Sequence, residues 1–284
     1  MMYVGLSGGI DSMVLLHKMC IEYGSQNITA IHVNHHISAN SKNWENFCRE
    51  YCETHNIGFI VKPVHLTSNT EDEARKHRYN AYRECCSEIY LAHHADDDVE
   101  TMLFKMIRGC GLSGLKGMAS NITYGGLTVH RPLLKITKAE IHAYATTHKL
   151  QWVTDESNHS DAYSRNFLRN QIIPSIKERF PMCVTSMIRL KENITEADDL
   201  TTEIAVSDMH ETQMILKQVL TLTPLRRRNL VRHYIKTTVG NLPPANQFNE
   251  FIRQLETSTN GKKPKINVGT VIIGIQDKKI GVIV

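Results

Sequence analysis

The feature that most constrains this chain is a glycine-containing loop, Ser7-Gly8-Gly9-Ile10-Asp11-Ser12. It lies between a short apolar run, 3–6, and a helical pattern that begins at Met13. A strand, a tight glycine turn and a helix start, in this order, form an anion site. The glycines expose backbone N–H groups, and the helix N-terminus adds partial positive charge. The sequence therefore predicts phosphate binding here, although a plain Gly-Gly turn before a helix is the structural alternative.

The polar side chains of this loop indicate which kind of ligand it can bind. The hydroxyls of Ser7 and Ser12 can donate hydrogen bonds to phosphate oxygens, whereas Asp11 needs a Mg²⁺ ion to lie beside a phosphate. The loop lacks the wider glycine spacing and the lysine of a Walker motif. It resembles the SGGxDS loop of the N-type ATP pyrophosphatases, the PP-loop enzymes, which bind the pyrophosphate of ATP.

Strand and helix signals alternate through the first half of the chain, which is typical of a parallel sheet with crossover helices. We therefore expect an α/β fold with a parallel doubly wound sheet, in which ligands bind beyond the C-terminal ends of the strands. The polar segments 7–12, 32–36 and 93–98 each follow a strand and are expected to converge there. The expected strands are 3–6, 28–33, 59–64 and 90–92, and the expected helices 43–55, 71–89, 98–107 and 137–148.

The densest polar cluster is the segment 93–101, which contains four acidic residues. On a helix that begins near Asp96, the side chains of Asp97 and Glu100 share a face. Acids in a first turn also stabilise the helix dipole, which would explain them without any ligand. Beside a phosphate site, so much negative charge otherwise requires a cation. Either Mg²⁺ or the ammonium group of a bound amine would supply it.

Composition limits the compartment and the cofactors. No apolar run is long enough to span a membrane, and no leader segment is visible, so we expect a cytoplasmic protein without membrane contact. The seven cysteines include no CxxC pair, which argues against a disulfide framework. The fifteen histidines form no pattern of zinc spacing.

A set of motifs occurs in the order found in one family: SGGIDS, HVNHHISAN, ARKHRY, HHADDDVET, RGCGLSGLKGM, RPLLKI and DESNHSDAYSRNFLRN. Through them the chain resembles the tRNA(Ile)-lysidine synthetases over nearly all of residues 3–175. The resemblance implies ATP and Mg²⁺ as cofactors, with L-lysine and an isoleucine tRNA with a CAU-type anticodon as partners. ATP would adenylate the wobble cytidine, and the lysine amine would then expel AMP at carbon 2. One departure is Asp98, an added negative charge where the family usually carries glutamine.

The resemblance also implies roles for individual residues. ATP would contact Ser7, Gly8, Gly9, Ile10, Asp11, Ser12, His32 and Val33, with Asp11 also on the metal. Catalytic candidates are Asp11, His94, Asp96, Asp97 and Glu100. The base that deprotonates lysine stays open among His93, His94 and Asp96. Substrate contacts are expected from Asp97, Glu100, Arg108, Gly109, Arg165, Asn166 and Arg169. Arg75, Arg78 and Arg131 are cations suited to phosphate or tRNA, and the loop 155–158 either lies near the base or forms an Asx turn.

The C-terminal part of the chain has a different character. Residues 206–284 carry 12 Lys and Arg against 5 Asp and Glu, which favours a polyanionic partner. We expect a PP-loop catalytic domain at 1–180, a linker helix at 181–205, and a small basic α+β domain at 206–284 with strands at 266–275 and 279–284. Arg226, Arg227 and Arg228 would face tRNA from one helix face, or simply face solvent. The chain is similar to a short form of the family, without the last C-terminal domain of many relatives.

Two other classes of protein share the phosphate-loop signal. A PP-loop tRNA thiolase needs a catalytic cysteine or a cluster-binding CxxC, which the sequence does not place. A tRNA-binding protein that had lost catalysis would not be expected to retain both the SGGIDS loop and the acid cluster.

Overall fold

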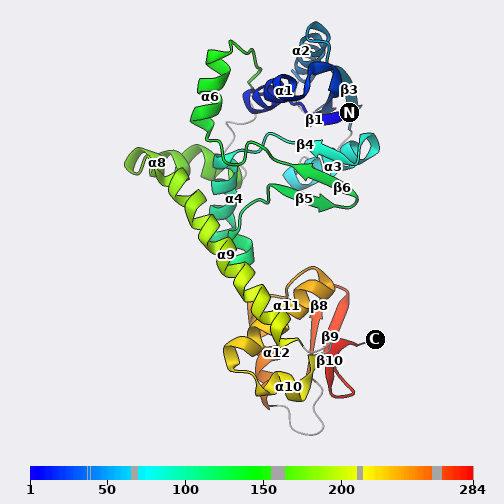
Figure 1. Cartoon of the computed structure of the whole chain (residues 1–284), viewed down its shortest axis with the longest axis vertical. Coiled ribbons are helices and arrows are strands. Elements are labelled where there is room, and N and C mark those ends of the chain that lie inside the picture. Colours follow the sequence, from blue (N-terminus) through cyan, green and yellow to red (C-terminus); the bar gives the residue numbers. More distant parts are fainter. Residues whose placement is uncertain are drawn as a thin grey trace. The chain divides into compact units, whose positions relative to one another are not determined.

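The N-terminal unit, Met1–Ile194, is built on a six-stranded sheet with the order β3-β2-β1-β4-β6-β5 (Figure 1). The strands are β1 (Met2–Gly5), β2 (Ile28–Asn34), β3 (Gly58–Pro63), β4 (Glu88–Tyr90), β5 (Asn121–Tyr124) and β6 (Leu127–His130). All neighbours pair in parallel except β5 and β6. This computed structural model describes residues 1–36, 38, 40–64, 70–154, 164–209, 214–257 and 264–283. The predicted parallel doubly wound sheet is confirmed.

The antiparallel pair β5–β6 is an addition to the predicted fold. Its turn is made by Gly125 and Gly126, which both have positive φ angles, 56° and 82°. Two consecutive residues of this conformation form the two-residue turn that fits the twist of a hairpin. No element was predicted for these residues, although the Gly125-Gly126 pair is a hairpin signal in the sequence.

Helices cover both faces of the sheet. The helices of this unit are α1 (Ile10–Tyr23), α2 (Ser41–Thr54), α3 (Glu71–Cys85), α4 (Ala95–Ile107), α5 (Leu112–Leu115), α6 (Lys138–Thr147), α7 (Ser164–Phe167) and α8 (Ile173–Arg179). A π-helical turn, Leu168–Ile172, joins α7 to α8. Helix α3 ends before the predicted residue 89, because Cys86 is already in an extended conformation and β4 begins at Glu88.

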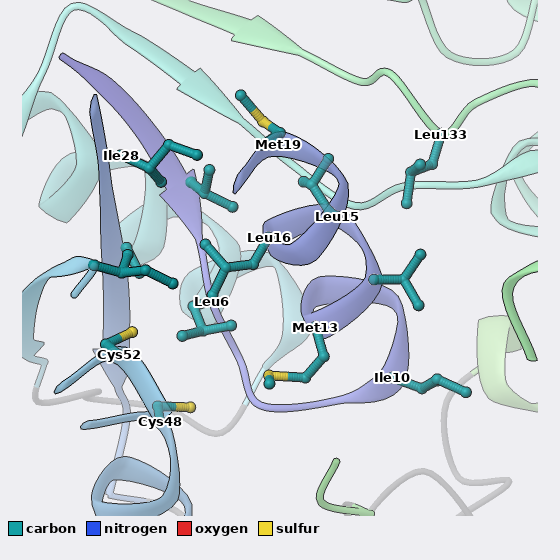
Figure 2. Packing of buried hydrophobic residues seen from close by; sticks show 14 of the residues in the cluster. Leu6, Ile10, Met13, Leu15, Leu16, Met19, Ile28, Cys48, Cys52 and Leu133 are labelled. Carbon is teal, nitrogen blue, oxygen red and sulfur yellow. The ribbon is translucent and has the colours of Figure 1, made fainter. Parts of the chain in front are cut away.

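The core of this unit follows the alternation of the strands. Val4 and Ala30 point to the face covered by α1, α2 and α6, where Figure 2 shows Leu16, Cys48 and Cys52 packed together. Residues of the opposite register, such as Ile31 and Ile89, pack against Tyr79 and Tyr82 of α3 on the other face.

The C-terminal unit, Thr195–Val284, has its own core. It contains the end of α9 (Cys183–Asp208), then β7 (Met214–Ile215), α10 (Leu216–Thr221), α11 (Pro224–Val239), α12 (Ala245–Thr257), β8 (Lys265–Val268), β9 (Val271–Gln276) and β10 (Lys279–Ile283). The sheet has the order β7-β10-β9-β8 and is antiparallel. The expectation of one strand at 266–275 is wrong, because a turn with Gly269 at φ 62° divides it into β8 and β9.

Candidate active site

The loop between β1 and α1 has the geometry of an anion site. Gly8 has a φ of 87°, and a Cβ atom there would lie 2.9 Å from Val153 and 3.1 Å from the Cys48 sulfur, so only glycine fits. The hydroxyls of Ser7 and Ser12 lie 3.1 Å apart, and Ser12 donates to the Gly9 carbonyl at 2.8 Å. Helix α1 begins directly after Gly9 without a side-chain cap. Its first N–H groups therefore remain available to a ligand.

A cleft of about 1020 Å³ opens beside this loop. Its lining combines the three segments expected to converge: it includes Asp11 of the loop, His32 near the end of β2, and Asp97 in the first turn of α4. The convergence at the carboxyl edge of the sheet is therefore confirmed. The predicted site residues that line the cleft are Ser7, Gly9, Ile10, Asp11, Ser12, His32, Val33, Arg75, Arg78, Asp97 and Arg169. Those that do not line it are Gly8, His94, Asp96, Glu100, Arg108, Gly109, Arg165 and Asn166.

Lys138 is a site residue that the sequence patterns did not predict. It is the first residue of α6, and its ammonium group contacts both oxygens of Asp11, at 2.7 and 2.8 Å. Thr137 and Glu140 form a capping box that fixes this helix start. The lysine lies just after the RPLLKI motif. The only sign in the sequence that it belongs to the site is that it is a cation at the start of a capped helix. The cleft thus has a cation within reach of the phosphate loop.

Asp97 and Glu100 share a face of α4, as predicted, and hold one cation between them. Arg169 of the π-helical turn donates from Nε to Glu100 at 2.8 Å and from a terminal nitrogen to Asp97 at 3.3 Å. Glu100 is only 4% exposed. Burial raises the pKa of Glu100, and the neighbouring Arg169 opposes that rise. The pair is therefore a site for a positively charged, hydrogen-bonding group.

The other two acids in the first turn of α4, Asp96 and Asp98, contact groups of the protein itself. Asp96 accepts from the Lys138 backbone N–H at 2.7 Å and from the Lys177 ammonium. Burial acts to raise the pKa of Asp96, but these donors outweigh it and the pKa is lowered. Asp98 is completely buried and accepts from the Met118 N–H at 2.5 Å and from the Lys191 ammonium. The negative charge that Asp98 adds, where the family usually carries glutamine, is paired with Lys191, and Asp98 is not among the residues that line the cleft.

Two histidines precede α4 and differ in role. His94 is the N-cap of the helix and forms a capping box with Asp97. Its Nε2 lies 3.6 Å from Asp11 and 3.5 Å from Asp97. His93 lines the cleft, and burial lowers its pKa to about 3. Arg131 is buried and donates to His93 at 3.3 Å and to the Ala119 carbonyl at 2.7 Å, so these partners lie within the protein, and its suitability for phosphate or tRNA stays a prediction.

Comparisons with known proteins agree with this geometry. A family model of the PP-loop domain matches residues 1–176. The chain belongs to the PP-loop family. A second family model, of the TilS substrate binding domain, matches residues 216–276. Where the residues are described, no helix is both long enough and apolar enough to cross a membrane.

Two curated relatives of this PP-loop protein carry the same name, tRNA(Ile)-lysidine synthase. The protein of Nitrosomonas europaea is 36% identical over 266 residues, covering 89% of this chain and 58% of that protein. The protein of Haemophilus ducreyi is 35% identical over 276 residues, covering 93% of this chain and 64% of that protein. The chain therefore spans less than two thirds of the length of these relatives.

A solved structure supports the fold of the PP-loop domain. The U34-tRNA thiolase NcsA from Methanococcus maripaludis aligns with a TM-score of 0.55 at 23% identity, covering 69% of this chain and 71% of that chain. Among the residues that the structure describes, no cysteine lines the cleft. Cys48, next to Gly8, is fully buried, and burial raises its pKa to about 12, which disfavours the thiolate form.

The far end of α4 holds the remaining predicted substrate residues. The guanidinium groups of Arg108 and Arg165 lie over the Phe104 ring, at 4.6 and 5.4 Å from its centre. Gly109, with a φ of 74°, ends the helix, and Asn166 lies on α7 beside Arg165. The predicted loop 155–158 falls outside the described residues.

The predicted arginine run of the C-terminal unit does not form one face. Arg226 pairs with the buried Asp208, with Nε donating at 3.0 Å. Arg227 contacts Glu256 at 2.6 Å and two backbone carbonyls, those of Leu220 and Leu222. Arg228 donates to Asn249 at 2.7 Å. Consecutive helix positions point about 100° apart, which explains why the three side chains reach different partners.

Proposed function

We propose that this chain is an ATP-dependent tRNA(Ile)-lysidine synthase. The wobble cytidine of an isoleucine tRNA with a CAU-type anticodon attacks the α-phosphate of ATP through its base oxygen, and pyrophosphate leaves. The amine of L-lysine then attacks carbon 2, the carbon–oxygen bond breaks, and AMP leaves. The names of the relatives and the matched substrate binding domain support this tRNA substrate. With tRNA as its substrate, the enzyme would act in the cytoplasm.

The observation that carries the proposal is the acid pair of α4 beside the phosphate loop. Asp97 and Glu100 already bind one cation, the Arg169 guanidinium, through charge-assisted hydrogen bonds. An ammonium group offers the same charge and donors, so a lysine amine can take that place. Asp97 and the phosphate loop line one cleft, which would bring an amine and an adenylated base together.

Asp11 is the residue that would hold Mg²⁺. The described residues contain no group of three metal-ligating side chains. Mg²⁺ is commonly held by one or two carboxylates together with substrate phosphates, so the single carboxylate of this loop fits that pattern. Once bound, the ion would neutralise charge on the phosphates. Lys138, at 2.7 Å from Asp11, supplies a second positive charge at the same place.

His94 is the strongest candidate for the base that accepts the proton from lysine. Both oxygens of Asp96 already accept hydrogen bonds, which disfavours that residue. His93 lies in the cleft, but a pKa of about 3 makes it a weak base. His94 lies within 4 Å of both Asp11 and Asp97, between the proposed metal and amine sites.

Product analysis tests this function directly. The full chain is incubated with ATP, Mg²⁺, lysine and a tRNA carrying the CAU anticodon, and the anticodon fragment is examined by mass spectrometry. We expect a mass gain of one lysine less one water. A gain that corresponds to sulfur in place of oxygen would instead assign the chain to the thiolases, and an unchanged fragment would contradict catalysis.

Asp11→Asn tests the metal role within the same assay. We expect tRNA-dependent pyrophosphate release to fall by about 100-fold or more, since the variant removes the only carboxylate of the loop. Binding of tRNA, measured by filter retention, should be unchanged. Near-normal pyrophosphate release by the variant would contradict the metal role.

A further inference from the structure

A continuous stripe of functional side chains runs along α4, away from the cleft. Asp97, Glu100, Phe104 and Arg108 recur at intervals of three and four residues, so they lie on one face of the helix. The neighbouring segment follows the same line, because Arg169 contacts the two acids and Arg165 lies over Phe104. The stripe begins at the proposed amine site and ends at the C-terminal end of α4.

The end of this stripe is an aromatic and cationic surface, here called the Phe104 platform, formed by Phe104, Arg108 and Arg165. The two guanidinium groups lie 4.6 and 5.4 Å from the centre of the ring. Phe104 is partly exposed and Arg108 is exposed. Aromatic rings and guanidinium planes are the groups on which unpaired RNA bases stack, and arginines also attract the phosphates between them.

We propose that the Phe104 platform binds a base of the anticodon loop by stacking while the target cytidine occupies the cleft. This inference rests on the proposed function, since it assigns a second contact to the same RNA. From Asp97 to Arg108 the helix rises about 16 Å, which corresponds to about five stacked nucleotides. A flanking base of the same loop can therefore reach the platform, whereas the target base itself cannot occupy both places.

Single-stranded RNA is the occupant that the platform fits. Two arginines beside an aromatic ring match a polyanion that carries flat bases, and the stripe connects them to the site of base modification. A protein partner would use the exposed apolar side chains next to the platform, such as Ile107, which is 69% exposed. Ile107 lies off the stripe, so substituting it separates the two occupants.

Fluorescence of a purine analogue, placed in turn at each loop nucleotide that flanks the CAU triplet, tests the proposal. The probe is a synthetic RNA stem-loop with CAU in its loop, titrated with the full chain. We expect quenching on binding to the wild-type chain, because a stacked fluorescent base loses emission. Phe104→Leu, which keeps the bulk but not the ring, should lose the quenching and bind about ten-fold more weakly. Phe104→Trp should restore both, and the matched control Ile107→Ala should behave as wild type.

The outcomes separate this inference from the proposed function. Wild-type quenching and affinity that persist in Phe104→Leu would overturn the platform, whether or not lysidine forms. A loss of affinity in Ile107→Ala equal to that in Phe104→Leu would show an apolar contact and would also overturn stacking. Failure of the wild-type chain to form lysidine, with quenching still dependent on Phe104, would instead overturn the reaction and leave the RNA contact standing.

Discussion

The acidic run of α4 and the arginine run of α11 look alike in the sequence, since each places three like charges at consecutive positions. In α4, Asp97 faces the cleft, while Asp96 and Asp98 accept hydrogen bonds from lysines of the N-terminal unit. In α11, Arg226, Arg227 and Arg228 each contact a different acceptor of the C-terminal unit. A run of like charge therefore does not by itself define a binding surface.

The helical period explains which side chains near each run of like charge lie on a common face of the helix. Asp97 shares its face with Glu100, and the two acids bind one arginine. Arg228 shares its face with Arg232, and both guanidinium groups lie over the Phe248 ring, at 5.5 and 5.3 Å from its centre. Burial, and then the nearby Arg228, lower the pKa of Arg232. Arg228 and Arg232, rather than three consecutive arginines, form the cationic pair of this helix.

The largest effect on stability is expected where the acidic run is buried. Asp98→Asn removes the carboxylate charge that the Lys191 ammonium contacts, at a position where the Asp98 side chain has no access to solvent. We expect the free energy of unfolding to fall by about 3 kcal/mol, measured by urea denaturation. Asp98→Asn combined with Lys191→Met should recover most of that loss, because no charge then stays unpaired. A loss below about 0.5 kcal/mol in the single variant would show that the pair contributes little.

Smaller effects are expected from substitutions in the arginine run. One arginine should affect stability and another should affect tRNA binding. Arg226→Gln removes the partner of the buried Asp208, so the free energy of unfolding should fall by about 1 kcal/mol. Arg228→Gln should leave stability nearly unchanged but weaken tRNA binding, with the slope of log affinity against log salt reduced by about one. If the slope of log affinity against log salt were the same for the wild type and Arg228→Gln, Arg228 would be a solvated residue that does not contact tRNA.

An effect that is absent at neutral pH concerns the titration of a histidine beside α4, whereas the arginines of α11 stay charged throughout. His93, beside α4, has a pKa lowered to about 3 by burial, so between that value and about 6.5 the unfolded chain binds more protons than the folded chain. Stability is therefore lost as the pH falls through this range. His93→Gln keeps an acceptor for Arg131 and should reduce the slope by about 1 kcal/mol per pH unit or less, measured by denaturation at several pH values. An unchanged slope would assign the acid sensitivity to other groups.

The sequence predicted the parts of the molecule that local patterns control. The glycine loop and the alternation of apolar segments were sufficient for the doubly wound sheet and for the convergence of segments 7–12, 32–36 and 93–98. The contacts that assign each acid of α4 its role depend on distant residues: Lys138, Lys177 and Lys191 lie 42 to 93 positions from the acids of α4 that they contact. No spacing rule brings such partners together, so the sequence did not show that Asp96 and Asp98 are paired with lysines.

The central claim is that the acid pair of α4 binds lysine separately from the site that activates ATP. Single-turnover kinetics of Glu100→Gln, with pyrophosphate release and lysine incorporation followed in the same reaction, tests it most directly. Pyrophosphate release is expected to stay within about two-fold of wild type, while the lysine concentration for half-maximal incorporation rises about ten- to hundred-fold, as expected for the loss of a charged hydrogen-bond acceptor. An equal fall in both steps, in a variant that unfolds like wild type, would place Glu100 in the ATP site and contradict the claim.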